Sequence, residues 1–229
     1  MIRENLQQLK EKIATIALRC GRDPQEIELL AVSKRMTAEQ VGEAWHCGQH
    51  LFGENFVQEA MEKIPLLDPA IRWHFIGHLQ SNKARQAAHL FAMVETVDRL
   101  KLAVELNKHA TACDRPLDIL VQVNVGQEPQ KSGIAPQKVE QFLTELGTLQ
   151  HLRVRGLMAI PPYAEDPEQS RPFFRALKEL ADHCRGRGLF ADNTSVVLSM
   201  GMSGDYPVAI EEGATLLRVG TAIFGERPR

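Results

Sequence analysis

Short apolar runs alternate with segments of helical periodicity along almost the whole chain, and this alternation constrains the fold more than any other feature. Short, continuous apolar runs are typical of parallel strands that are buried on both faces. Eight such runs are visible, and eight strand and helix units close a parallel (β/α)8 barrel. The runs lie at residues 28–33, 51–53, 72–76, 91–97, 117–125, 152–159, 195–199 and 216–219.

Helical patterns fill the intervals, most clearly at residues 99–110, 136–146 and 168–185. Pro172 fits the last of these helices only in its first turn. We also expect an extra helix before the first strand, because apolar residues recur there at helical spacing: Ile2, Leu6, Leu9, Ile13 and Ala17.

A doubly wound sheet would alternate in the same way. We favour the α/β barrel because the 229 residues show no break in composition, no linker and no sign of a second domain. The sequence therefore predicts one TIM-like barrel domain over residues 1–229.

Charge and targeting signals exclude several classes of function. Lys and Arg minus Asp and Glu gives 27 − 29 = −2, so the chain has no basic surplus for nucleic acid. The charged amphipathic opening is unlike a secretory signal, and no apolar run is long enough to span a bilayer, so we expect a cytoplasmic protein. The four cysteines lack metal-ligand spacing, and His74 and His78 have no third ligand near them, so we expect no metal site.

In a parallel barrel, functional residues follow the C-terminal ends of the strands. That rule selects a short set of polar and glycine positions. These are Ser33, Lys34, Gly53, Glu54, Asn55, Gly77, His78, Gln80, Asn124, Met158, residues 199–205, Arg218, Gly220 and Thr221.

Lys34 is the most informative of these positions. A lysine held against the apolar end of a strand is desolvated, which lowers its pKa and frees its amine to attack an aldehyde. Most lysines only solvate the surface, and that interpretation stays open on the pattern alone.

Two glycine-containing loops favour an anion site. Gly201 and Gly204 let the backbone approach a ligand, and Ser203 adds a hydroxyl. Gly220 and Thr221 offer the same after the last strand, and the loops after strands seven and eight of barrels frequently bind phosphate. Taken singly, each loop is equally well explained by a strand end and a helix cap at Ser203 or Asp205.

Arg218 lies inside an apolar strand, where its guanidinium needs an acceptor or a carboxylate. It is either a structural ion pair or a donor to a neutral ring nitrogen, since arginine keeps its proton. Thr96, Asp98 and Arg99 begin a helical pattern and predict a helix cap. Lys131 lies in a segment best explained as a turn.

Nine motifs now resemble one known family, the YggS/PROSC family of pyridoxal phosphate (PLP) homeostasis proteins. Found together and in this order, the motifs are highly specific for the family, although each motif alone is weak evidence for it. They are AVSK at 31–34, FGEN at 52–55, VQEA at 57–60, WHFIG at 73–77, LQSNK at 79–83, KSGI at 131–134, GLMAI at 156–160, LSMGMSGD at 198–205 and VGTAIFG at 219–225.

The resemblance implies a barrel similar to the N-terminal domain of alanine racemase, with PLP bound as an internal aldimine. By motif, Lys34 is implied as the Schiff-base residue, Asn55 lies beside the cofactor and Met158 lies near its ring. The implied phosphate cradle consists of Ser199, Met202, Ser203, Gly220 and Thr221. Arg218 is implied to face the pyridine nitrogen.

Two motifs depart from the family pattern. Many members carry a second lysine and a proline where this chain has Met36 and Thr37, so one alternative amine near the cofactor is missing. Many also have aspartate where this chain has Gly204, but Ser203 and Asp205 remain.

The resemblance implies a role in vitamin B6 and amino-acid homeostasis. An arginine opposite the pyridine nitrogen makes the ring a poorer electron sink, and 229 residues leave no room for the second base of a racemase. We therefore expect a monomer that holds and delivers PLP with little turnover, with PLP-dependent apo-enzymes as candidate partners and no membrane or nucleic-acid partner. Two rivals remain: an amino-acid racemase using His78, Tyr163 or Tyr206 as the opposing group, and a PLP-free barrel enzyme acting on a phosphorylated metabolite.

Overall fold

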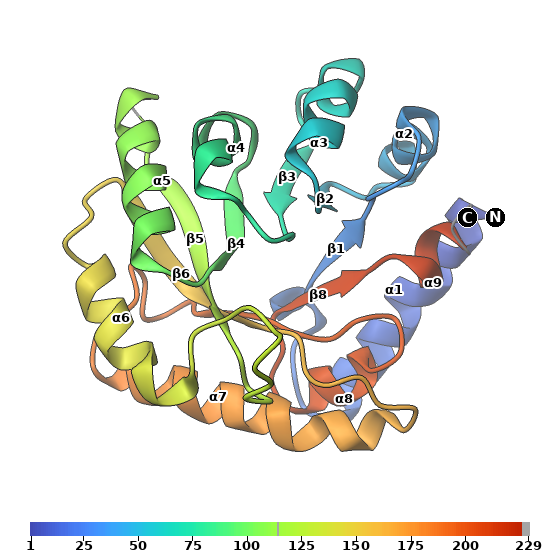
Figure 1. Cartoon of the computed structure of the whole chain (residues 1–229). Coiled ribbons are helices and arrows are strands. Elements are labelled where there is room, and N and C mark those ends of the chain that lie inside the picture. Colours follow the sequence, from blue (N-terminus) through green and yellow to red (C-terminus); the bar gives the residue numbers. More distant parts are fainter. Residues whose placement is uncertain (114, 226–229) are drawn as a thin grey trace.

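Eight parallel strands close into a barrel in which each strand pairs with the next and β8 returns to β1 (Figure 1). The computed structural model describes residues 1–113 and 115–225. The strands are β1 (Glu28–Val32), β2 (Leu51–Glu54), β3 (Arg72–Phe75), β4 (Met93–Val97), β5 (Leu117–Val123), β6 (Leu152–Ala159), β7 (Val197–Ser199) and β8 (Leu216–Val219). Pairing of β1 with β8 confirms the barrel and excludes the doubly wound sheet, whose edges stay open.

Helices surround this barrel, and those after the first strand lie in the intervals between strands (Figure 1). They are α1 (Ile2–Arg19), α2 (Ala38–His46), α3 (Val57–Lys63), α4 (Ala84–Leu90), α5 (Leu100–Ala112), α6 (Val139–Leu146), α7 (Arg171–Gly186), α8 (Tyr206–Glu211) and α9 (Thr221–Phe224). Short 3-10 segments are Pro24–Glu26, Ile64–Leu66, Ser81–Lys83, Pro136–Lys138 and Pro167–Ser170. Pro172 lies in the first turn of α7, as its missing N–H requires.

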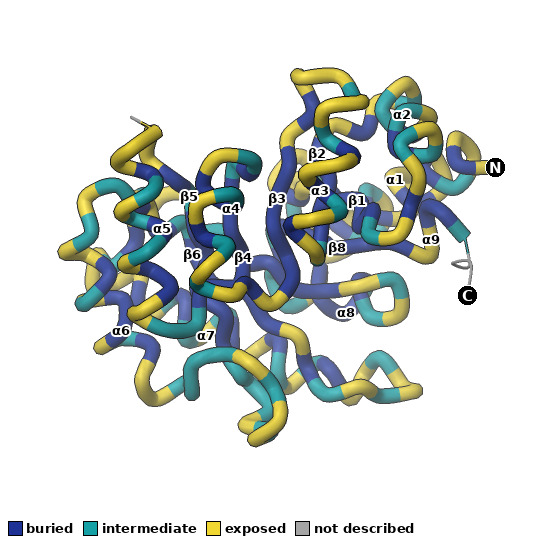
Figure 2. The backbone as a smooth tube through the Cα atoms, turned by 45° about the horizontal axis from the view of Figure 1, so that its top comes forward, coloured by how far each residue is buried: buried dark blue, intermediate teal, exposed yellow. Residues whose placement is uncertain are grey.

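Alternation along the strands divides the apolar side chains between two layers. Leu30 and Val32 pack with residues from neighbouring strands in one small interior cluster, and Met93, Leu120 and Met158 form another. The intervening strand residues join the larger core between the barrel and its helices. Figure 2 shows the strands almost wholly buried, while the helices alternate between buried and exposed positions.

The expected N-terminal helix is confirmed as α1, which lies beside α8 and α9 (Figure 1). All five of its expected apolar positions are buried. Asn5 also donates from Nδ2 to the Ile223 carbonyl at 2.9 Å, which ties the first helix to the last one. Among the described residues, none of the helices has the length and apolar character that a membrane span requires.

The prediction of a side-chain cap at the start of α5 is wrong. The residue before α5 is Arg99, and no side chain caps the helix there. Thr96 instead donates from Oγ1 to the Gly77 carbonyl at 2.6 Å, and Asp98 pairs with Arg99. Thr96 lies inside β4, so its hydroxyl satisfies the loop that follows β3 rather than the helix.

Candidate functional site

The candidate site lies at the mouth of the barrel, by which we mean the C-terminal ends of the strands and the loops that follow. Lys34 lies two residues after the end of β1 and is half-buried in a turn whose Met36 N–H donates to the Ser33 carbonyl at 3.0 Å. Arg35, the third residue of this turn, has a φ of 63°, a region that non-glycine residues occupy at a cost of about 1–2 kcal/mol. Neighbouring contacts must therefore hold the turn that carries Lys34.

A buried polar cluster behind the turn supplies those contacts. Lys63 on α3 donates to the Ser33 carbonyl at 2.9 Å, to Glu54 Oε1 at 2.7 Å and to Glu59 Oε1 at 2.6 Å. The Ser33 hydroxyl donates to the same Glu54 oxygen at 2.7 Å, and the Arg35 N–H donates to Glu59 at 2.5 Å. All three ammonium hydrogens of Lys63 are thus used inside the cluster.

Glu54 is fully buried in this cluster. Burial raises the pKa of Glu54, and the nearby Lys63 ammonium and Ser33 hydroxyl offset that rise only in part. Its second oxygen, Oε2, is buried and has no hydrogen-bond partner among the described residues. A buried carboxylate in this setting costs free energy whenever it is ionised.

Glutamine at position 54 should remove a pH-dependent loss of stability. A raised pKa means that the folded protein binds the Glu54 proton more tightly than the unfolded chain does. Its stabilising contribution therefore falls as pH rises above the unfolded value of about 4.3. As pH rises above about 4.3, the difference in free energy of unfolding should move in favour of Glu54→Gln over the wild type.

Urea unfolding across that pH range measures this difference. Glu62→Gln, at an exposed position of α3, is the matched control. A difference between the wild type and Glu54→Gln that stays constant with pH, or moves toward the wild type, contradicts the prediction.

Asn55 follows β2 and lies at the same level as Lys34. Val32 pairs with Gly53, so Lys34 and Asn55 each come two residues after paired positions on neighbouring strands. Asn55 Oδ1 is buried without a hydrogen-bond partner among the described residues. A buried orphan acceptor at the mouth fits a ligand that donates to it.

Gly77 maintains the position of Asn55. A Cβ atom at Gly77 would lie 2.1 Å from the Asn55 carbonyl oxygen, which is a backbone atom and cannot rotate away. A side chain there would therefore push Asn55 out of place.

A chain of buried polar groups crosses the barrel interior below the mouth. Arg218 on β8 donates from Nη1 to Ser199 Oγ at 2.6 Å and from Nη2 to the Ala159 carbonyl at 2.8 Å. Ser199 in turn donates to Glu95 Oε2 at 2.5 Å, and His74 Nδ1 lies 2.7 Å from Glu95 Oε1. Both oxygens of this fully buried carboxylate are thereby engaged.

Arg218 is an obligatory hydrogen-bond donor in this chain. Burial lowers the pKa of Arg218, and the negative charges of Glu95 and Asp205 oppose that shift. Arginine nevertheless keeps its proton in proteins, so it can donate to a ligand but never accept from one. Met158, fully buried, pairs with Ser199 across β6 and β7 and lies close to this group.

The two predicted anion-binding loops lie together. The Ala222 N–H lies 3.5 Å from Ser203 Oγ, which brings the loop after β7 to the start of α9. Gly201 has a φ of 92°, and a Cβ atom there would lie 2.6 Å from the Ala209 side chain. Asp205 holds the same loop by accepting from the Met202 N–H at 2.7 Å.

Exposure divides these loop residues into two groups. Met202 and Thr221 are exposed and Ser203 is half-buried, whereas Gly220 is buried at the residue before α9. Ser199 lies apart from the other predicted cradle residues, since its hydroxyl is occupied by Glu95 and Arg218. The Ser199 hydroxyl thus contacts Glu95 and Arg218 in the barrel interior and not the contact between Ser203 and Ala222.

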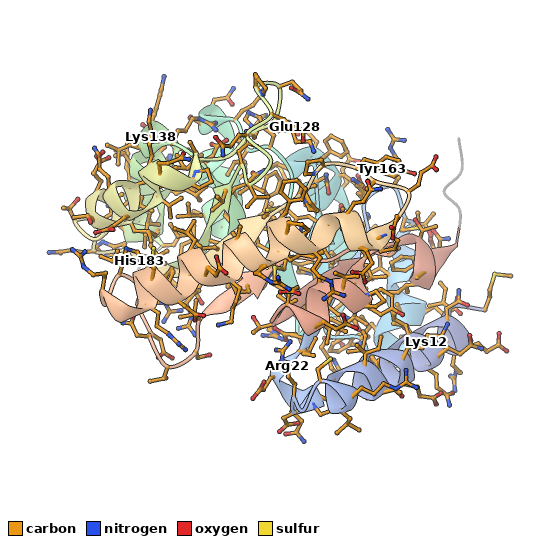
Figure 3. The ribbon with its side chains drawn as sticks, turned by 90° about the horizontal axis from the view of Figure 1, so that it is seen from below. Lys12, Arg22, Glu128, Lys138, Tyr163 and His183 are labelled. Atoms are coloured by element: carbon orange, nitrogen blue, oxygen red, sulfur yellow. The ribbon has the colours of Figure 1, made fainter. Side chains whose placement is uncertain are left out.

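The three candidates for the second acid or base of a racemase lie in different parts of the structure. Tyr163 is 92% exposed and lies at the periphery near the start of α7 (Figure 3). Tyr206 is buried in α8, and burial raises the pKa of its phenol. His78 is exposed, with Nδ1 at 3.3 Å from the Ser132 hydroxyl.

Glu95 and Lys63 are site-supporting residues that the sequence reasoning missed. Glu95 had a detectable signal, because it is a lone charge in the apolar run at 91–97. Lys63 had none, because Glu59, four positions before it, indicates only an ordinary helix surface pair. Its two other partners, Glu54 and Ser33, are nine and thirty positions away.

A cavity of about 910 Å³ lies at the opposite end of the barrel, where the strands begin. Arg72 and Lys178 line it, but Arg72 pairs with Glu28 and Lys178 pairs with Asp182. Among residues 1–113 and 115–225, no group of three or more metal-ligating side chains comes together. The candidate site is therefore placed at the mouth and not in this cavity.

Comparison with known proteins gives consistent results. A family described as alanine racemase, N-terminal domain, matches residues 4–228. The pyridoxal phosphate homeostasis protein of Escherichia coli (strain K12) is 44% identical over 230 residues, covering 99% of this chain and 97% of that protein. PipY of Synechococcus elongatus with PLP bound has a TM-score of 0.86 and 36% identity, covering 98% of this chain and 100% of that chain.

A more distant likeness concerns the fold alone. An alanine racemase from Corynebacterium glutamicum has a TM-score of 0.71 at 17% identity, and the match covers 100% of this chain and 61% of that one. The barrel is thus shared with proteins of widely different sequence.

Proposed function

The chain belongs to the alanine racemase N-terminal domain family and, within it, to the pyridoxal phosphate homeostasis proteins, and on this premise we propose that it binds PLP covalently through Lys34. The chain acts as one barrel domain that holds the cofactor as an internal aldimine and serves intracellular PLP and amino-acid homeostasis. The PLP bound to PipY supports the choice of cofactor.

One observation carries this proposal. Lys34, Arg218 and the two predicted anion-binding loops, which follow β7 and β8, come from different strands to the same end of the barrel. Leu30 pairs with Arg218 and Ala31 with Val219, so the Lys34 turn and the loop after β8 leave neighbouring strands. Schiff-base formation, a donor to a ring nitrogen and phosphate binding are the three demands that PLP makes of a site.

Each residue has a distinct part in this proposal. When bound, PLP supplies an aldehyde for the lysine amine and an electron-withdrawing ring. Ser203, Gly220 and Thr221 bind the phosphate, and Met202 closes the cradle beside them. Asn55 and Met158 flank the ring, and Arg218, oriented by Ser199, donates to its nitrogen.

Arg218 also supports the proposal of little turnover. A donor that keeps its proton leaves the ring nitrogen unprotonated, and the ring then stabilises a carbanion less well than one paired with a carboxylic acid. Tyr163 is almost fully exposed, and Tyr206 lines a surface pocket with residues of α1 such as Glu11 and Lys12, so neither position favours a second base of a racemase. We accordingly propose a carrier that acts in the cytoplasm as a monomer and delivers PLP to apo-enzymes.

The visible spectrum of the purified protein with added PLP tests the proposal. We expect a yellow protein, and borohydride reduction followed by peptide mapping should place the pyridoxyl group on the peptide that contains Lys34. In deuterated water, single L-amino acids should show no Cα exchange above that caused by free PLP.

Two results would overturn parts of this proposal. A colourless protein, or an adduct spread over surface lysines, would favour the barrel enzyme acting on a phosphorylated metabolite. Rapid Cα exchange by the holoprotein would replace the carrier with a racemase-like enzyme.

A further inference from the structure

We propose that Lys63 and Glu59, on the outer face of the barrel wall, are positioning residues that hold the turn of Lys34 for covalent capture of PLP. This inference rests on the proposed function. The two residues belong to α3, whereas the turn belongs to the segment after β1, so the contact joins two separate elements.

The contacts lie on the backbone immediately before and after Lys34. Lys63 donates to the Ser33 carbonyl at 2.9 Å, and Glu59 accepts from the Arg35 N–H at 2.5 Å. Lys63 and Glu59 are themselves joined at 2.6 Å. The pair therefore forms a clamp, defined here as Lys63 and Glu59, that spans the residue carrying the reactive amine.

The clamp is anchored from below by the barrel wall. Glu54 accepts from Lys63 and from the Ser33 hydroxyl at 2.7 Å each, and its side chain is wholly buried. Lys63 is only 6% exposed. Because long side chains lose rotamer freedom when every donor is satisfied in a buried site, this arrangement is rigid rather than adaptable.

The turn needs such a clamp for a specific reason. The φ of 63° at Arg35 favours glycine, and a turn of this kind usually has glycine at its third position. Without Glu59, Arg35 would relax toward negative φ, and the chain direction at Lys34 would change with it. The Lys34 amine would then be displaced from the aldehyde, because the phosphate of the cofactor stays anchored on the loops after β7 and β8.

Misplacement of a reacting group by about 1 Å can lower a rate by about 100-fold. The clamp therefore affects the rate at which Lys34 captures the aldehyde of PLP, and not the binding of the phosphate. Pyridoxamine 5′-phosphate, which has no aldehyde, separates these two effects.

The experiment compares Glu59→Ala, Glu59→Gln and the double variant Lys63→Met with Glu54→Gln. The double variant removes the lysine without leaving Glu54, the wholly buried one of its two carboxylate partners, charged and unpaired. Glu62→Ala on α3 and Lys101→Met on α5 are exposed controls. For each protein, stopped-flow absorbance gives the rate of Schiff-base formation with PLP, and calorimetry gives the affinity for pyridoxamine 5′-phosphate.

We expect Glu59→Ala and the double variant to slow Schiff-base formation by at least about 10-fold and to leave pyridoxamine 5′-phosphate affinity within about twofold. Glu59→Gln, whose amide oxygen still accepts from Arg35, should recover most of the rate. An unchanged rate in Glu59→Ala overturns the proposal, as does an equal loss of rate and of pyridoxamine 5′-phosphate affinity together with a lowered melting temperature. Failure of the wild type to form any Schiff base overturns the proposed function, and the positioning role with it.

Discussion

Replacing Lys34 with alanine should abolish covalent capture of PLP while leaving the phosphate site able to bind. Lys34 lies two residues after the end of β1, the strand next to β8 and its loop of Gly220 and Thr221. Its removal takes away the amine and leaves intact the contact between Ser203 and Ala222. The yellow colour should be lost, and borohydride should fix no pyridoxyl group at this position.

The retained phosphate site gives the prediction a second measurement. Pyridoxamine 5′-phosphate should bind the alanine variant with an affinity within about 10-fold of the wild type, because the phosphate contacts supply most of its binding. Lys138→Ala is the matched control, since Lys138 is exposed and lies in the short helical segment before α6 (Figure 3). It should keep the colour and the adduct.

An adduct found on another residue of the variant would change the assignment. Lys131 is the alternative amine to examine, because its Nζ contacts Glu128 and lies 3.1 Å from the Pro161 carbonyl. If the pyridoxyl group maps to Lys131 in both the wild type and Lys34→Ala, Lys34 is not the Schiff-base residue.

The barrel was predictable because its signals are local. Each strand is a short apolar run, and the observed bounds differ from the expected ones by only a few residues; β6 and β8 agree at both ends. Strand order needed no further information, since successive parallel strands joined by helices close in sequence order.

The supporting polar groups were less predictable because their partners are remote in sequence. Lys63 meets Ser33 across thirty positions, and a lysine at the end of an amphipathic helix normally faces water. The predicted cap at Thr96 was wrong for a related reason. A hydroxyl near the start of a helix suggests a cap, but β4 extends to Val97 and directs the Thr96 hydroxyl to the Gly77 carbonyl.

The role of Ser199 shows where motif and geometry give different information. The motif groups it with the phosphate residues, but β7 ends at Ser199, where its side chain enters the barrel interior with Arg218 and Glu95. Ser199 and Ser203 are close in sequence, but Ser199 ends a strand and points into the barrel, whereas Ser203 lies in the loop beyond and contacts the start of α9.

Glu95 is the residue on which this interior chain depends, and its replacement by glutamine should destabilise the protein severely. The carboxylate is 0% exposed, accepts from Ser199 at 2.5 Å and opposes the desolvation of Arg218. Removing Glu95 takes away the larger of the two negative charges that offset the burial of Arg218 and leaves only Asp205. Breaking a buried charge interaction costs about 3–5 kcal/mol. We expect a loss of at least about 3 kcal/mol in the free energy of unfolding, measured in urea at neutral pH.

The controls separate lost charge from lost shape. Glu11→Gln, exposed on α1, should change stability by less than about 0.5 kcal/mol. The double variant Glu95→Leu with Arg218→Leu should be more stable than Glu95→Gln, because apolar replacement of a whole buried pair is often neutral. If Glu95→Gln instead loses less than about 1 kcal/mol, the charge of Arg218 is balanced by other groups, and Glu95 serves only to orient Ser199.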